Sequence, residues 1–251
     1  MNCSTVNILD LSDEMLLTIL NKLSNTDVLY SFIEVNRKLD RLARDITFTQ
    51  SVDLVTILSN EHDDSRNKSV LDRFCSDIIP QIQHNIECFT LDPLSIDGVL
   101  CTENYSKLHK LTLVNLQLEV AADESSFVRI FKHKISHLTV TINDNNTAQY
   151  IRKLSTNVFT TIFTMFTNLT DLHFSLKDIC RYPQTSLIDL VSTTCYPSNI
   201  IYLNVRVRNF NDCLSLLDGR LWKLQTFIVE IDRINTTSMT INNTVKYFKL
   251  R

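Results

Sequence analysis

Residues 108–113 are LHKLTL, a run in which Leu108, Leu111 and Leu113 occupy the first, fourth and sixth places. Six other runs of the same form begin at Ile86, Ile135, Leu169, Ile200, Leu224 and Val245. Alternation of apolar and polar residues is typical of a strand with one buried face. We therefore expect seven strands whose fourth and sixth residues face inward.

The segments between these runs favour helices, because helical patterns occur at residues 127–131, 158–166, 187–191 and 214–217. Strands that alternate with helices predict an α/β fold with a parallel sheet. Successive runs begin 21 to 34 residues apart, and residues 86–251 resemble leucine-rich repeats, whose period is about 20–29 residues. The resemblance implies an irregular solenoid with a curved parallel sheet. The asparagine that closes the strand in that family is in register only at Asn143. An ordinary α/β sheet with helical crossovers is the alternative.

The N-terminal stretch at residues 8–45 has apolar residues at helical spacing. Ser12 suits the N-cap of a first helix, with acidic residues in the turn that follows. Ser24 and Asp27 form the sequence pattern of a capping box, which predicts the start of a second helix. About forty residues in two or three short helices rarely bury enough apolar surface to fold alone. We therefore expect this stretch to pack against another structural element.

This stretch resembles the F-box, the helical module by which substrate adaptors bind the Skp subunit of cullin-RING ubiquitin ligases. The resemblance is carried by Leu11, Glu14, Leu16, Ile19, Leu20, Leu23, Asp27, Leu29, Val35, Asn36, Arg37, Leu39 and Leu42. It implies Skp binding through Leu11, Leu16, Ile19, Leu20, Leu23, Leu29, Val35 and Leu39. The sequence departs from the family at Ser12, where proline is usual, and at Leu39, where tryptophan is common. The alternative is an amphipathic helical hairpin without this role.

We expect three parts: an F-box-like module at 1–45, a helical bridge at 46–85 and the repeat-like domain at 86–251. Within the bridge, residues 48–59 predict a short helix and residues 60–67 a polar loop. Helical spacing resumes over residues 69–83, where Pro80 should end or bend the helix.

Composition narrows the classes of function. The 251 residues carry a net charge of −3 and have a pI near 6.1, which gives no reason to expect a nucleic-acid or membrane partner. Only two glycines occur, too few for the phosphate-binding loops of nucleotide-binding proteins, so we expect no such cofactor. The seven cysteines are odd in number and form no C-x-x-C pair, which predicts reduced thiols in the cytoplasm or nucleus. Neither a signal peptide nor a transmembrane run is expected.

The third, fifth and seventh residues of each run should point to the open face of the sheet. The seventh residue is Asp92 in the first run and Arg251 in the last. Aromatic and arginine side chains often anchor protein partners, and one cluster on this face combines such groups. We expect it to bind a protein substrate through Asp171, His173, Tyr202, Arg206 and Ile228.

No set of catalytic residues stands out, and we expect the protein not to be an enzyme. His133 and His137 have i, i+4 spacing, but no cysteine or carboxylate completes a metal site, and the second histidine falls in a strand. The segment 132–134 (KHK) is basic without the aromatic residues of a nucleic-acid groove. The leading hypothesis is a non-catalytic adaptor of a Skp-cullin-F-box ligase. The alternatives are a protein-binding repeat scaffold whose N-terminal helices form the solenoid's cap, and an enzyme with an unrecognised site.

Overall fold

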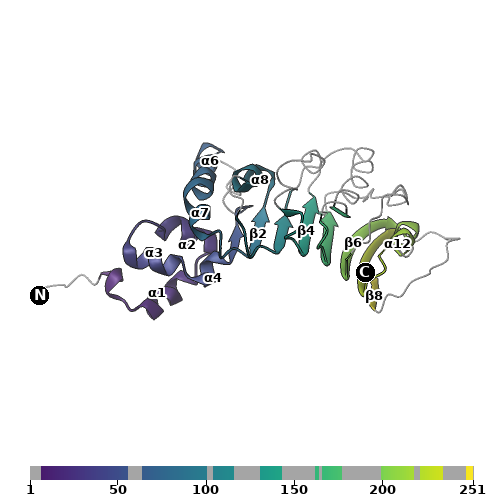
Figure 1. Cartoon of the computed structure of the whole chain (residues 1–251), viewed down its shortest axis with the longest axis horizontal. Helices are drawn as coiled ribbons and strands as arrows, with labels where there is room; N and C mark the ends of the chain where they lie inside the picture. The colour runs from purple at the N-terminus through teal and green to yellow at the C-terminus, as the bar shows by residue number, and fades with distance from the viewer. Residues whose placement is uncertain are drawn as a thin grey trace, which may run out of the picture. The chain divides into compact units, whose positions relative to one another are not determined.

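The computed structural model describes residues 7–55, 64–100, 104–115, 131–142, 162–163, 166–176, 199–217, 221–233 and 247–250. The protein is α/β, with an open, all-parallel sheet and several helices (Figure 1). The chain forms two compact units. The first contains Met1–Thr90 and Cys101–Leu108, and the second contains Leu91–Leu100 and His109–Arg251.

The described elements follow one another along the chain with these bounds. The helical elements are η1 (Ile8–Asp10), α1 (Asp13–Leu20), α2 (Asn25–Phe32), α3 (Arg37–Ala43), α4 (Ile46–Thr49), α6 (Asp64–Arg73), η2 (Phe74–Ile78), α7 (Ile79–Ile82), α8 (Pro93–Leu100) and α12 (Phe210–Leu216). The strands are β1 (Ser51–Asp53), β2 (Cys88–Leu91), β3 (Lys110–Leu113), β4 (His137–Ile142), β5 (Asp171–Leu176), β6 (Tyr202–Asn209), β7 (Thr226–Arg233) and β8 (Tyr247–Leu250).

Both predicted helix starts in the N-terminal stretch are confirmed. The Ser12 hydroxyl accepts a hydrogen bond from the Met15 amide at the start of α1. At the start of α2, the Asp27 amide donates to Ser24 Oγ at 3.1 Å, and the Ser24 hydroxyl donates to the Asp27 carboxylate at 2.7 Å. These bonds satisfy amides that have no partner within the first turn of a helix. The predicted second helix is divided, because α2 ends at Phe32 and α3 begins at Arg37.

The prediction of one helix over residues 48–59 is wrong. The helix α4 ends at Thr49, and the chain then forms strand β1, which pairs in parallel with β2. Side chains of α2 hold this strand, because Asn25 Nδ2 donates to the Ser51 carbonyl at 3.0 Å and Thr26 Oγ1 donates to the Asp53 carbonyl at 2.7 Å. Val52 is fully buried. Tertiary contacts therefore override the local helical pattern.

Helical structure from Asp64 to Ile82 is continuous but changes type near Pro80. The segment Phe74–Ile78 is a π-helix, and Pro80 lies in the first turn of α7 that follows it. Proline has no amide hydrogen and clashes with the carbonyl four residues earlier, so a wider turn accommodates it. The helix does not end at Pro80, which was one of the two expected effects, but changes type just before it. Residues 64–67 of the expected polar loop belong to α6, and residues 60–63 lie outside the described residues.

Within the described residues, the second unit contains six strands in sequence order, β3 to β8, each parallel to the next (Figure 1). All seven predicted strands are present, since β2 accounts for the first run. The inward-facing fourth and sixth residues are buried wherever the side chains are described, from Phe89 and Leu91 to Phe227 and Val229. The first residue of each run from Ile86 to Leu224 is buried as well. The α12 helix packs against β6 and β7.

One residue expected on the open face is instead buried. The Asp92 carboxylate accepts a hydrogen bond from the Ser95 amide at 2.9 Å, and the Asp92 amide donates to Ser95 Oγ at 3.0 Å. This reciprocal pair precedes and opens α8, a helix that the sequence patterns did not predict. The expected helix at 214–217 falls within and just after α12. Those expected at 127–131, 158–166 and 187–191 lie mostly or wholly outside the described residues, as does Asn143.

Candidate protein-binding surfaces

One side of helix α1 exposes apolar side chains at the spacing of successive helical turns. Met15 is 54% exposed and Ile19 is 44% exposed, and Leu23, just beyond the helix, is 45% exposed. We call these three residues the α1 face. Leu16 and Leu20, on the adjoining side of the same helix, are buried in the core of the first unit. The helix therefore has two apolar stripes, of which only one is covered.

The eight residues implied by the F-box resemblance do not share one surface. Leu16, Leu20 and Leu29 are buried, whereas Ile19, Leu23 and Val35 are exposed. Leu11 and Leu39 are half-buried. The sequence reasoning missed Met15, which lies four residues before Ile19 on the same side of α1. Its spacing from Leu11 and Ile19 is the signal that could have found it.

Two cationic side chains of α3 hold the N-terminal segment in place. Lys38 Nζ donates to the backbone carbonyls of Leu9 and Leu11, at 2.9 Å and 2.5 Å. Arg41 Nη2 donates to the Asp13 carboxylate at 2.6 Å, and this hydrogen bond lowers the pKa of Asp13. Both interactions connect α3 to the start of α1. They give the α1 face a defined position within the first unit.

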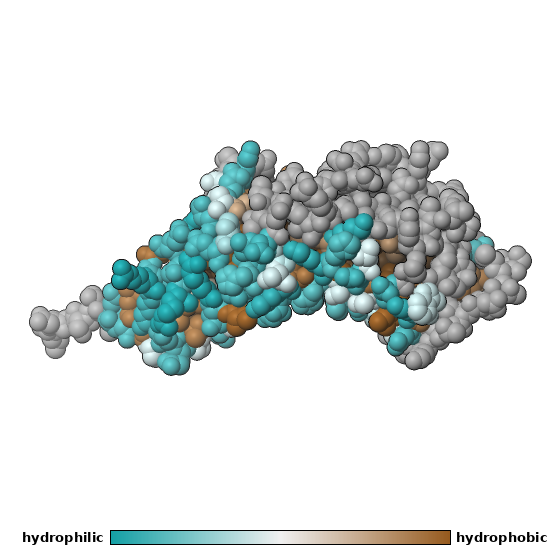
Figure 2. Space-filling model, viewed as in Figure 1, coloured by the Kyte–Doolittle hydropathy of each residue, from teal (hydrophilic) through white to brown (hydrophobic). Residues whose placement is uncertain are grey.

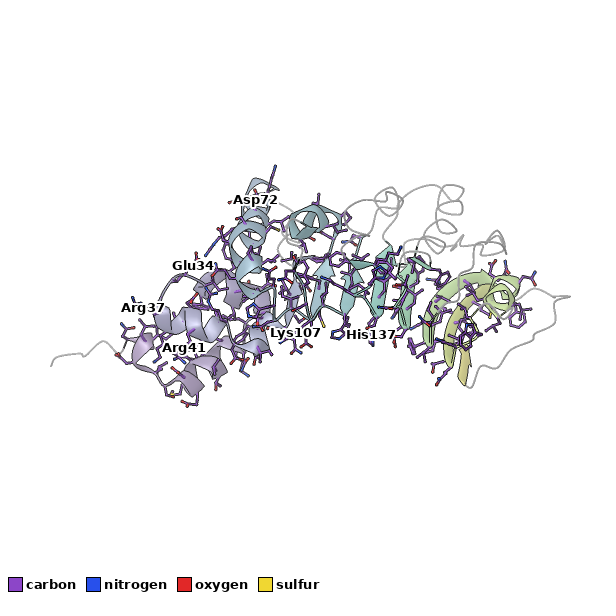
Figure 3. The ribbon with its side chains drawn as sticks, in the orientation of Figure 1. Glu34, Arg37, Arg41, Asp72, Lys107 and His137 are labelled. Carbon is purple, nitrogen blue, oxygen red and sulfur yellow. The ribbon has the colours of Figure 1, made fainter. Side chains whose placement is uncertain are left out.

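A second network fixes the turn between α2 and α3, where Val35 is exposed. Glu34 has φ 66°, a left-handed backbone conformation that is uncommon outside glycine. Its amide donates to Asp40 Oδ1 at 2.9 Å, and Arg44 donates to both carboxylate oxygens of Asp40, each at 2.9 Å. Arg44 lowers the pKa of Asp40 through these bonds. Gln81 Nε2 donates to Glu34 Oε1 at 2.8 Å, which ties the turn to α7. Figure 3 labels Glu34 among the helices of this unit.

The open face of the second unit carries the predicted substrate-binding residues on three neighbouring strands. The strand register places Asp171 beside Tyr202, and the row two residues further along contains His173 and Ile228. Arg206 lies opposite Glu230, with Arg206 Nε and Glu230 Oε1 3.7 Å apart. The five predicted residues are therefore brought together on one face. Their side chains are exposed or half-exposed.

Sequence reasoning missed two polar partners on this face. His137 Nε2 lies 3.5 Å from Asp171 Oδ2, and its Nδ1 lies 2.8 Å from the Ser136 hydroxyl. The second partner is Glu230, which faces Arg206. The repeat pattern could have found both, because equivalent residues of successive runs lie side by side when parallel strands pair without an offset. The His137–Asp171 contact and the Arg206–Glu230 ion pair place basic and acidic side chains next to each other from β4 to β7.

Metal-binding side chains do not converge in the described part of the chain. Within it, no three His, Cys, Asp or Glu side chains are grouped as ligands for a metal ion. His133 Nδ1 lies 2.9 Å from the Thr167 hydroxyl. Burial raises the pKa of the Cys213 thiol to about 12, with a smaller effect of the Asp212 charge, so this cysteine stays a neutral core residue.

Comparison with known proteins leaves the family undetermined: no protein-family model matches the chain, and no curated protein matches it either. None of the helices in the described residues has the length and apolar composition of a membrane span. The assignment of a function therefore depends on the surfaces themselves. Figure 2 shows hydrophobic residues scattered among hydrophilic ones over the surface that it draws in colour.

Proposed function

We propose that the chain is a non-catalytic substrate adaptor of a Skp-cullin-F-box ubiquitin ligase. Its N-terminal helices bind the Skp subunit, and the open face of its repeats binds a protein substrate. The observation that supports this most is the α1 face, where three apolar side chains are exposed on a helix already anchored by its other side. The same stretch resembles the F-box.

The physical case for a partner on the α1 face rests on its apolar area. Full burial of a Leu, Ile or Met side chain is worth about 1.5–3 kcal/mol. Because Met15, Ile19 and Leu23 are about half-exposed, covering them contributes on the order of 2–4 kcal/mol. Glu14, Asn21 and Lys22 are exposed around them, and a polar rim around an apolar centre is the usual composition of a protein interface. A second helical protein such as the Skp subunit fits this face.

The repeat-like unit supports the substrate-binding half of the proposal. Its parallel strands follow the sequence order, and equivalent places of successive runs align into rows on the open face. Stacked repeats present such extended surfaces to other proteins. The mechanism is positioning: other subunits carry out catalysis, and this chain raises the effective concentration of the substrate near them.

A second candidate function is a repeat scaffold without a ligase, in which the N-terminal helices form only a cap. Strand β1 favours it, because β1 pairs with β2 while α2 and α4 pack against β1. These helices therefore cover a sheet edge that would otherwise be exposed to pairing with another chain. The cap and the adaptor are structurally compatible. Only the adaptor requires binding to the Skp subunit.

A binding assay with the purified Skp subunit distinguishes the two candidate functions. The full chain should bind it, and Met15→Asp combined with Ile19→Asp should weaken binding on the order of 100-fold, since two charges replace apolar contacts. The matched control is Ser31→Asp combined with Ser69→Asp, which adds the same charge at exposed polar positions of the same unit that belong neither to the α1 face nor to its polar rim. It should bind within a few-fold of wild type. Absence of binding by the folded wild type would leave the scaffold as the function.

A further inference from the structure

The residue directly before each run of the strand pattern is asparagine or lysine in six of the seven runs, and we call its place the clamp position. The six residues are Asn85, Lys107, Lys134, Asn168, Asn199 and Lys223. Four of them donate a side-chain hydrogen bond to the segment that precedes the neighbouring strand, namely Asn85, Asn168, Asn199 and Lys223. The clamp position lies at the opposite end of the strand from the asparagine that closes it in leucine-rich repeats. A residue type and a bond that recur at one place of a repeat indicate a shared structural task.

Three clamp side chains of the second unit bond consecutive turns to one another. Asn168 Nδ2 donates to the His133 carbonyl at 2.6 Å. Asn199 uses both ends of its side-chain amide, because Nδ2 donates to the Thr167 carbonyl at 3.0 Å and Oδ1 accepts from Lys223 Nζ at 2.6 Å. These bonds connect the turns that precede β4, β5, β6 and β7 into one row.

Strand pairing begins two residues after the clamp position. The amides of Ile201 and Tyr202 both donate to the Thr170 carbonyl, at 2.8 and 3.0 Å. The amides of Gln225 and Thr226 donate in the same way to the Ile201 carbonyl, at 2.9 and 3.0 Å. The clamp bonds therefore extend the connection between repeats from the strands into the turns that precede them.

Each of these clamp residues lies three positions before a residue of the open face. The pairs are Asn168 and Asp171, Asn199 and Tyr202, and Lys223 and Thr226. The register places the three open-face residues side by side in one row. A strand that slips by one residue turns every side chain to the other face of the sheet. A fixed turn before each strand therefore protects the arrangement of this row.

We propose that Asn168, Asn199 and Lys223 are positioning residues, which fix the starts of β5, β6 and β7 and so hold this row of the open face in one arrangement for a partner. A surface that is already ordered loses less entropy when a partner binds. The role of the row in substrate binding rests on the proposed adaptor function. The clamp bonds themselves belong to the second unit and need no partner.

Trp222 supplies a local signal for one of the clamps. Lys223 Nζ, which donates to Asn199 Oδ1, lies 4.8 Å from the centre of the Trp222 ring. Asn199→Ala removes the oxygen that holds the ammonium group, so acrylamide, a neutral quencher, should quench Trp222 more strongly than in wild type. Asn199→Asp keeps an oxygen for Lys223 and loses only the donation to the Thr167 carbonyl. Its quenching should equal that of wild type.

The main test is amide hydrogen exchange of the full chain without any partner, comparing wild type with Asn168→Asp combined with Asn199→Asp. Aspartate has the shape of asparagine, but its carboxylate cannot donate a hydrogen bond. The first amides of β5 and β6 should exchange about tenfold faster, because two hydrogen bonds of ordinary strength are lost beside them. Amides in the middle of the same strands should stay within about twofold of wild type, since local opening does not extend that far.

The matched control is Asn204→Asp combined with Gln225→Glu, which makes the same change from amide to carboxylate outside the clamp position, on and beside the same strands. Its exchange should follow that of wild type. The proposal is overturned by unchanged exchange in the clamp variant, by equal acceleration along the whole of β5 and β6, by the same effect in the control, or by equal quenching in Asn199→Ala and Asn199→Asp. Because no partner takes part, such a result leaves the adaptor function standing, and a lack of Skp binding leaves the clamp standing.

Discussion

Leu20→Asp should unfold the helices of the first unit, whereas Ile19→Asp, one residue earlier, should leave them folded. Leu20 is 3% exposed and Ile19 is 44% exposed, although both are apolar residues of the same helix. A carboxylate at position 20 would lose its hydration without gaining a partner, which costs several kcal/mol. The total stability of a domain is only about 5–15 kcal/mol, so we expect a loss of more than about 4 kcal/mol.

This pair of variants is measured by urea unfolding followed by circular dichroism of the helices. Ile19→Asp should shift the free energy of unfolding by less than about 1 kcal/mol, because surface substitutions rarely cost more, while removing most Skp binding. Equal destabilisation by the two variants would contradict the assignment of one buried and one exposed stripe on α1. The comparison also separates residues that hold the unit together from residues that contact a partner.

Phe227→Ala should destabilise the second unit by about 3–5 kcal/mol, the usual cost of removing a buried aromatic side chain and leaving a cavity. Phe227 is fully buried on β7, where its register partners are Leu203 on β6 and Phe248 on β8. Its neighbour Thr226 points to the open face and is half-exposed. Thr226→Ala should therefore cost less than about 1 kcal/mol, within the range of strand propensities.

The chain's single tryptophan lies in the second unit, so its fluorescence can follow the unfolding of that unit. Trp222 precedes β7, is exposed, and lies under the Lys223 ammonium, which is 4.8 Å from its ring. Its fluorescence during urea unfolding reports on the second unit. A cost for Phe227→Ala no larger than that for Thr226→Ala would contradict the inward position of the fourth residue of each run.

The seven strands were predictable because each run combines two independent signals. Period-two alternation predicts which side chains are buried, and the repeated first residue, such as Leu108, lies two positions before the start of each strand. Both signals arise from burial on one side of a sheet. The same alternation predicted the rows on the open face, including the neighbours Asp171 and Tyr202.

Elements without a long pattern were not predictable. Strand β1 has three residues, too few for a period to appear, and its position depends on bonds from Asn25 and Thr26 on another element. Helix α8 follows directly after β2. Its N-terminal bonds join Asp92, which the strand pattern had assigned to the open face, to Ser95. Such contacts depend on tertiary structure, which local periodicity does not contain.

For the candidate Skp-binding residues, the sequence predicted that they are apolar positions of a helix but not which of them are exposed. Helical spacing identifies Leu16, Ile19 and Leu20 equally well. It does not say which stripe of α1 another element of the same chain covers, because that depends on how α1 packs. Packing buries Leu16 and Leu20 and leaves Ile19 exposed beside Met15. The resemblance to the F-box has the same limit, because it names residues without distinguishing those in the core from those that contact a partner.

Amide hydrogen exchange of the full chain, with and without the purified Skp subunit, tests the adaptor function most directly. Binding should slow exchange in α1 and in the turn that follows it, Asn21–Leu23, and should leave β4 to β7 in the second unit unchanged. Exchange in α1 that is the same with and without the Skp subunit, at concentrations where wild type stays folded, would contradict it.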